Sequence, residues 1–391
     1  MTPAARHAAA IQILDLINTG QGVEKALKDW ARGHRFAGSG DRAAIRDICF
    51  DVLRKFRSVA ALGGGESGRA LVVGLLRDTG NDPSDIFTGT TYAPTALSDA
   101  EKAANTGLAD LPEDVGADCP AWLWPMVKDA LGTVGGAQVF ATLRDRAPLT
   151  MRANLRKSSR ATALAALADC GITGVENPLS DTAITLPDYP RNLKNIPPYT
   201  QGLVELQDAA SQAIVDALPV FVGGKILDYC AGGGGKTLAI AGRMHARFTA
   251  HDAFVPRMKD LPARAARAGV DVEILAGPPA DGREFDLVFC DAPCSGSGSW
   301  RRDPEGKWGL SRDGLRAVCA LQQQILQDAA QYVTEGGFLA YATCSFLPVE
   351  NKSQIENFLA SEPNWSLLSE KQFLPNQFGD GFYIAIIKKH R

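Results

Sequence analysis

Two cysteines each follow a run of apolar residues and precede small polar ones. Cys294 stands in FDLVFCDAPCSGSG at 285–298 together with Asp291, and Cys344 stands in GGFLAYATCS at 336–345. Such apolar runs are typical of buried parallel strands, whose carboxyl ends meet in one crevice. We therefore expect both thiols and the carboxylate at the same sheet edge, where a thiolate could act as a nucleophile.

A glycine-rich turn between a predicted strand and helix marks a second part of this crevice. Residues 226–237 read ILDYCAGGGGKT. Glycines let the backbone approach a ligand closely, and free N–H groups at a helix start suit a carboxylate or phosphate. The phosphate-loop pattern GxxxxGK[ST] fails at its first glycine, and Lys236 breaks the usual dinucleotide pattern. Asp252, at the end of the next strand, suits the ribose hydroxyls of a nucleoside cofactor.

Basic and aromatic residues are interleaved directly after the first cysteine stretch, in SWRRDPEGKW at 299–308. Cationic groups pair with phosphates and indole rings stack on bases, so this segment could contact RNA. An ordinary surface loop would explain the same composition. The candidate substrate-binding residues are Arg301, Arg302, Lys307 and Trp308.

Two thiols, an aspartate and a nucleoside-cofactor loop suggest methylation of cytosine at C5. C5 is too electron-poor to attack a methyl group unaided, but a thiolate added to C6 makes the ring an enamine whose C5 displaces methyl from a sulfonium donor. An acid at N3 and the 4-amino group would stabilise this adduct, and a base would then remove the C5 proton. The target base must leave its stack to reach the crevice. The residues alone do not decide which thiol attacks.

The surrounding patterns divide the chain into three parts. Helical periodicity predicts an all-helical domain over 1–130, followed by a small α+β, RRM-like subdomain over 131–203. Strands then alternate with helices over 204–391. This alternation predicts a parallel, doubly wound sheet of the Rossmann kind, so the expected fold class is α/β.

Composition narrows the class of protein further. The chain has 391 residues, 45% of them hydrophobic, which permits packed cores. No stretch approaches the roughly 18 apolar residues of a membrane helix, and no export signal is evident. Eight cysteines without a CxxC pair indicate reduced thiols in the cytoplasm and no structural metal. The net charge is −3, but the charge is unevenly distributed. Residues 1–60 form a basic block with ten Lys/Arg against six Asp/Glu. Such a block suits RNA phosphates or is simply a solvated helix face.

These stretches resemble the RNA cytosine-5 methyltransferase family of the Sun and nucleolar-protein type, in its bacterial small-subunit rRNA branch. The matching segments are VELQDAASQ (204–212), DYCAGGGGKT (228–237), DAPCSGSG (291–298), ATCS with ENxxxIxxFL (342–359) and DGFYIAIIKK (380–389). More loosely, residues 1–130 resemble the NusB-like, RNA-binding helical domain of that branch, especially at 40–55, and 147–200 is similar to its small α+β insert.

The resemblance implies a methyltransferase with S-adenosylmethionine as donor and RNA, in particular 16S rRNA, as acceptor. It implies that Cys344 is the nucleophile and that Cys294 assists release, with Asp291 and Lys236 beside them. The implied cofactor-binding residues are Cys230, Ala231, Gly232, Gly233, Gly234, Gly235, Lys236, Asp252, Arg257 and Asp291.

The chain departs from the family pattern at two points. Gly232 and Gly233 stand where the family usually has Ala-Pro, and 276–278 read Ala-Gly-Pro where an acidic residue would bind the adenine amino group. An inactive RNA-binding assembly factor of the same fold is therefore an alternative, and a tRNA cytosine-5 methyltransferase is another. A DNA cytosine methyltransferase is disfavoured, because those enzymes place a single cysteine in Pro-Cys-Gln. We expect a cytoplasmic monomer that binds no metal and no membrane.

Overall fold

The computed structural model describes residues 1–103, 107–220 and 222–390, and the chain forms two compact units. The first unit comprises Met1–Arg146 and Trp300–Gly309, and the second comprises Ala147–Ser299 and Leu310–Arg391. The predicted boundary at residue 130 lies just before Gly132, where α8 (Trp124–Leu143) is broken by a kink with φ 70°, and the helical unit extends beyond this kink to Arg146. The small α+β region belongs to the second unit together with the larger sheet.

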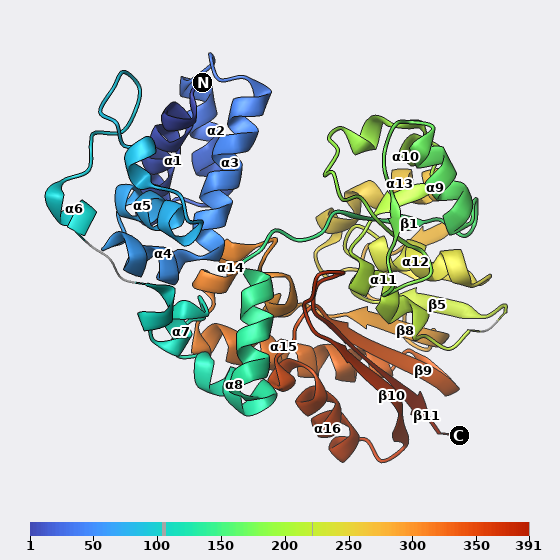
Figure 1. Ribbon diagram of the computed structural model, residues 1–391. Coiled ribbons are helices and arrows are strands. Elements are labelled where there is room, and N and C mark those ends of the chain that lie inside the picture. The colour runs from blue at the N-terminus through green and yellow to red at the C-terminus, as the bar shows by residue number, and fades with distance from the viewer. Residues whose placement is uncertain (104–106, 221, 391) are drawn as a thin grey trace. The chain divides into compact units, whose positions relative to one another are not determined.

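Every regular element in the described part of the first unit is a helix (Figure 1). Its first helix is capped by Thr2, whose hydroxyl accepts a hydrogen bond from Ala5 N, and Pro3 takes the first helical position. Besides α8, the helices are α1 (Pro3–Asn18), α2 (Val23–Gly33), α3 (Ser39–Arg54), α4 (Phe56–Gly63), α5 (Gly68–Asp78), α6 (Asp99–Ala103), α7 (Glu113–Gly116) and α14 (Pro304–Gly309), with 3-10 turns at Pro83–Asp85 and Leu108–Asp110.

Helices α4 and α5 cross closely because a glycine lies at the crossing. A Cβ atom on Gly74 would stand 1.8 Å from Val59 O. Val59, Leu71 and Val72 are fully buried in the core of this unit. No single helix among the described residues is long and apolar enough to span a membrane, and α4 with α5 meets that requirement only as a pair bent by 97°.

The small sheet of the second unit has the order β2-β3-β1-β4, with antiparallel neighbours. Asn154 Nδ2 donates to Ala268 O at 2.9 Å, and Arg152 Nη1 donates to Gly235 O at 2.9 Å, so this sheet is tied to the elements of the larger one. Its elements are β1 (Thr150–Ala153), β2 (Val175–Glu176), β3 (Ala183–Thr185), β4 (Val204–Leu206), α9 (Arg160–Ala168), α10 (Pro197–Thr200) and a 3-10 turn at Leu193–Asn195.

The larger sheet has the order β10-β11-β9-β8-β5-β6-β7. The five strands β5 to β9 are parallel, and β11 runs antiparallel between β9 and β10 (Figure 1). This arrangement confirms the predicted α/β, Rossmann-like fold class. The strands are β5 (Lys225–Asp228), β6 (Arg247–Ala250), β7 (Val272–Ile274), β8 (Phe285–Asp291), β9 (Val333–Thr343), β10 (Trp365–Phe373) and β11 (Phe382–Lys389).

Helices cover both faces of this sheet. Side chains alternate along a strand, so Leu287 and Phe289 of β8 join one core while Val288 and Cys290 join the other. The first core also contains residues of α11 (Ala209–Asp216), α12 (Gly235–Arg243) and α13 (Leu261–Ala268), and the second contains residues of α15 (Arg312–Ala330) and α16 (Lys352–Ser361). Further 3-10 turns lie at Val255–Asp260, Ser297–Ser299 and Pro348–Glu350.

Residues 300–309 belong to the helical unit although they follow the cysteine stretch in sequence. Trp300 is 1% exposed, and its ring lies 6.3 Å from that of Phe140. We expect Trp300→Ala to lower the free energy of unfolding by about 3–5 kcal/mol, because the truncation leaves a cavity. Urea unfolding followed by circular dichroism measures this loss.

Phe36→Ala is the matched control, because Phe36 lies in the same unit and is 74% exposed. Its expected effect is within about 0.5 kcal/mol, as is usual for an exposed site. Equal losses in the two variants would contradict the burial of Trp300.

Candidate active site

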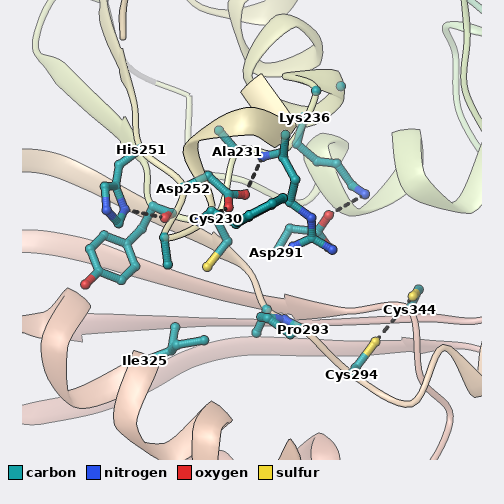
Figure 2. Close-up of a pocket in the computed structure, with 18 of the residues that line it drawn as sticks. Cys230, Ala231, Lys236, His251, Asp252, Asp291, Pro293, Cys294, Ile325 and Cys344 are labelled. Carbon is teal, nitrogen blue, oxygen red and sulfur yellow. Dashed lines mark hydrogen bonds and ion pairs between the residues drawn. The ribbon is translucent and has the colours of Figure 1, made fainter. Parts of the chain in front are cut away.

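Adjacent parallel strands bring the two predicted cysteines together. In the register of β8 and β9, Asp291 pairs with Ala342, and each strand is followed within three residues by its cysteine. The Sγ atoms of Cys294 and Cys344 lie 3.3 Å apart (Figure 2). The predicted convergence of both thiols on one sheet edge is therefore observed.

Hydrogen bonding makes the two thiols chemically different. The two Sγ atoms are hydrogen-bonded, and Cys294 is the donor whenever Cys344 is ionised. This bond holds the pKa of Cys344 below its ordinary value even though burial opposes the shift. The Lys236 ammonium and the Ser299 hydroxyl act in the same direction. The same bond, followed by burial, raises the pKa of Cys294 well above its ordinary value. Of the pair, Cys344 is the more readily ionised thiol.

Lys236 and Asp291 form an ion pair beside the thiols. Lys236 Nζ lies 2.6 Å from Asp291 Oδ2 (Figure 2). Burial disfavours the charge on Lys236, but the neighbouring Asp291 carboxylate outweighs it, and the pKa of Lys236 is raised. A buried charge needs such a partner because desolvation alone would neutralise it. The pair therefore keeps a cation and an anion fixed in the same space as the thiols.

The glycine-rich turn has the geometry of a ligand-binding loop. Gly234 adopts the left-handed conformation with φ 79°, and a Cβ atom there would stand 2.1 Å from Leu261 Cδ1. Asp252 is buried, and its carboxylate accepts hydrogen bonds from Gly232 N at 2.9 Å and Phe254 N at 2.8 Å. Asp252 therefore holds the glycine turn in place, a role that the sequence pattern did not suggest.

A cavity of about 830 Å³ joins these groups. Figure 2 shows the two sulfur atoms, Lys236 and Asp291 toward one end of it and His251 and Ile325 toward the other. The predicted site residues that line the cavity are Cys230, Ala231, Gly232, Gly233, Gly235, Lys236, Asp252, Arg257, Asp291, Cys294 and Cys344. Gly234 completes the turn at the start of α12.

The residues present fit S-adenosylmethionine. The nine-residue helix α12 begins at the turn, so its first N–H groups suit a carboxylate, and buried Asp252 suits ribose hydroxyls. Residues 276–278, where the family pattern has an acidic residue, are not part of the described cavity lining. Phe254, Gln324 and Asp328 line it instead.

Two residues near the site were missed by the sequence analysis. Ser299 contributes to the lowered pKa of Cys344, and its hydroxyl donates to Gly296 O at 3.1 Å. Asp228 ends strand β5, is fully buried and accepts a hydrogen bond from Thr237 Oγ1 at 2.6 Å. Burial raises the pKa of Asp228 to about 7. An acidic residue at the end of an apolar strand, directly before a glycine turn, was the signal available for Asp228.

All four predicted RNA-contacting residues belong to the helical unit, and the side chains of three of them are buried or bonded within it. Arg301 and Lys307 are each 1% exposed, and Trp308 Nε1 donates to the main chain of α3, at Leu53 O, over 2.6 Å. Lys307 Nζ donates to Arg54 O at 2.8 Å, and burial lowers the pKa of Lys307 to about 8. The assignment of Arg301 and Lys307 to substrate binding was wrong, because both side chains are buried, and the partly buried Trp308 has its indole N–H bonded within the protein. Arg302 is exposed.

The fold and the cavity define a Rossmann-like methyltransferase, and comparisons with known proteins agree. The family described as 16S rRNA methyltransferase RsmB/F matches residues 218–388, and a ferredoxin-like domain of RsmF/B-like methyltransferases matches residues 119–191. The ribosomal RNA small subunit methyltransferase B of Sodalis glossinidius is 36% identical over 311 residues, covering 75% of this chain and 68% of that protein.

Two further comparisons extend over almost the whole chain. The methyltransferase B of Vibrio cholerae is 28% identical over 98% of this chain and 97% of its own length. The crystal structure of a protein named PH0851 has a TM-score of 0.77 at 23% identity, over 100% of this chain and 99% of that one. The chain belongs to the 16S rRNA methyltransferase RsmB/F family. It is a methyltransferase that uses S-adenosylmethionine, which confirms the predicted enzyme class and cofactor.

The asymmetry of the thiols predicts a pH dependence. Alkylation needs the thiolate, so the rate at Cys344 should rise with pH and reach half its maximum below 9.0, the ordinary thiol value. Cys294→Ala removes the donor and should move this midpoint to higher pH. Peptide-level mass spectrometry after timed iodoacetamide treatment measures the rate at each cysteine.

Cys319→Ala serves as the control, because Cys319 lies on α15 of the same unit and its Sγ donates to Val349 O. It should leave the Cys344 midpoint unchanged. A Cys344 midpoint that stays the same in Cys294→Ala would mean that the Cys294 thiol does not stabilise the thiolate.

Proposed function

We propose that this enzyme methylates C5 of a cytosine in small-subunit rRNA, through a transient bond between Cys344 Sγ and C6 of the base. The observation that carries the proposal is the 3.3 Å separation of two thiols in the same cavity as the glycine turn. The relatives named ribosomal RNA small subunit methyltransferase B support rRNA as the acceptor.

Cys344 is the attacking thiol in this proposal because it is the one whose ionised form is stabilised. A hydrogen-bonded thiolate next to the Lys236 ammonium is available for addition to C6. When bound, S-adenosylmethionine supplies an electrophilic methyl group. Asp291 lines the same end of the cavity and is assigned to the edge of the cytosine or to the donor. Lys236 holds Asp291 through their ion pair.

The reaction itself would change the acidity of Cys294. The largest cause of its raised pKa is the hydrogen bond to Cys344. Once Cys344 Sγ is bonded to C6, it can no longer accept a hydrogen bond as a thiolate. The main cause of the raised pKa of Cys294 is then removed. Cys294 could then ionise and take the C5 proton after methyl transfer. The electron pair of the C5–H bond would restore the ring double bond as the C6–S bond breaks and the Cys344 thiolate leaves.

Methyl transfer from labelled S-adenosylmethionine to small-subunit rRNA tests the proposal. Cys344→Ala should lower the transfer rate by at least about 10³-fold, the scale of losing a covalent nucleophile, and should form no adduct. Cys294→Ala should accumulate a protein–RNA adduct on a denaturing gel, because addition proceeds while release is blocked. Cys319→Ala should behave as the wild type.

Several outcomes would contradict the proposal. Adduct formation by Cys344→Ala but not by Cys294→Ala would mean that Cys294 is the nucleophile and Cys344 assists release. No methyl transfer to rRNA by the wild type at saturating donor would favour an inactive assembly factor. Transfer to tRNA in preference to small-subunit rRNA would favour a tRNA cytosine-5 methyltransferase.

A further inference from the structure

A buried carboxylate contacts the residues that directly follow both cysteines. Glu350 lies in the 3-10 turn Pro348–Glu350 and is 0% exposed. Its Oε2 accepts hydrogen bonds from Ser295 Oγ and from Ser345 Oγ, each at 2.5 Å. Its Oε1 accepts one from Ser295 N at 2.7 Å. A single side chain thus holds the turn after Cys294 and the turn after Cys344.

The remaining donor comes from α15. Gln322, also fully buried, donates from Nε2 to Glu350 Oε1 at 3.1 Å and to Pro293 O at 2.9 Å. Glu350 therefore accepts four hydrogen bonds, and an ionised carboxylate has about four acceptor positions. Oxygen–oxygen distances of 2.5 Å are typical of hydroxyls that donate to a charged acceptor.

The serine hydroxyls have little freedom to change their roles. Ser295 Oγ accepts from Ser297 N at 3.2 Å, and Ser345 Oγ accepts from Leu347 N at 3.0 Å. Each hydroxyl accepts a main-chain N–H and donates its single proton to Glu350. A glutamine at position 350 would present an NH₂ group to at least one donor, so the arrangement depends on a carboxylate.

The two turns are also bonded directly to each other. Gly298 N donates to Cys344 O at 2.9 Å, and the hydroxyls of Ser297 and Ser345 lie 2.8 Å apart. These bonds keep the turns adjacent, but of the two cysteines they involve only Cys344. Glu350 is a charged group in this buried set of hydrogen bonds, and it binds both Ser295, which follows Cys294, and Ser345, which follows Cys344.

We propose that Glu350 is a positioning residue that fixes the separation of the two thiols by binding Ser295 and Ser345 at once. The inference rests on the proposed function, in which both sulfur atoms act on the same base. Misplacing reacting groups by about 1 Å can cost about a hundredfold in rate, so loss of this link should affect the chemical step.

Glu350→Gln tests the proposal by two independent measurements. The first is the rate at which diamide, a thiol oxidant, converts Cys294 and Cys344 to a disulfide, read by mass spectrometry of the folded protein without RNA or donor. The second is the kinetics of methyl transfer, in which kcat and KM are determined separately. We expect the disulfide rate and kcat each to fall at least about tenfold, with KM for S-adenosylmethionine and binding of S-adenosylhomocysteine unchanged, because the effect is confined to geometry at the thiols.

Glu356→Gln is the matched control, because Glu356 lies on the following helix α16, is 62% exposed and pairs with Lys352. It should leave both rates at the wild-type value. If Glu350→Gln fails to fold by circular dichroism, Ser345→Ala and Ser295→Ala carry the test, since each removes one hydroxyl from the carboxylate.

Each result either supports or overturns the proposal. A disulfide rate equal to that of the wild type, in Glu350→Gln or in both folded serine variants, would overturn it, even if kcat falls. Loss of S-adenosylhomocysteine binding together with kcat would also overturn it, because the effect would not be confined to the thiols. Failure of the proposed function is a separate result, in which the wild type forms the disulfide normally but transfers no methyl group to RNA.

Discussion

The contact between Cys294 and Cys344 is the constraint on which the rest of the site depends. The hydrogen bond between the two sulfur atoms, 3.3 Å apart, lowers the pKa of Cys344 and raises the pKa of Cys294, so one thiol becomes more acidic at the expense of the other. The contact exists because β8 and β9 are parallel neighbours that end in register, and because the following turns are bonded to each other. Without that register, neither cysteine would be distinguished from an ordinary buried thiol.

The other charged groups of the cavity are arranged around this pair. Lys236 adds positive charge near the Cys344 thiolate and is itself kept ionised by Asp291. Asp252 uses its carboxylate to order the glycine turn, so the same residue that suits a ribose also fixes the loop beside it. Lys236, Asp291 and Asp252 thus each have a partner, which lowers the cost of removing their charges from water.

Some of this organisation could be predicted from the sequence, because it is encoded by local patterns. The apolar run before Asp291 and the glycine turn before Lys236 identified the strands and the edge where they end. The destination of 300–309 could not be predicted in this way. Alternating basic and aromatic residues look the same whether they face RNA or a core, and the main-chain acceptors of Lys307 and Trp308 lie about 250 residues earlier. The role of Glu350 could not be predicted either, because its partner Ser295 is 55 residues away and no periodicity connects the two residues.

The assignment of Cys344 as the nucleophile is most directly tested by trapping the adduct on RNA containing 5-fluorocytidine. Fluorine in place of the C5 proton prevents the final elimination, so the attacking sulfur stays bonded to C6. Peptide sequencing of the trapped complex by tandem mass spectrometry should find the modified nucleotide on Cys344. A nucleotide attached to Cys294, or to any other residue, would contradict the account.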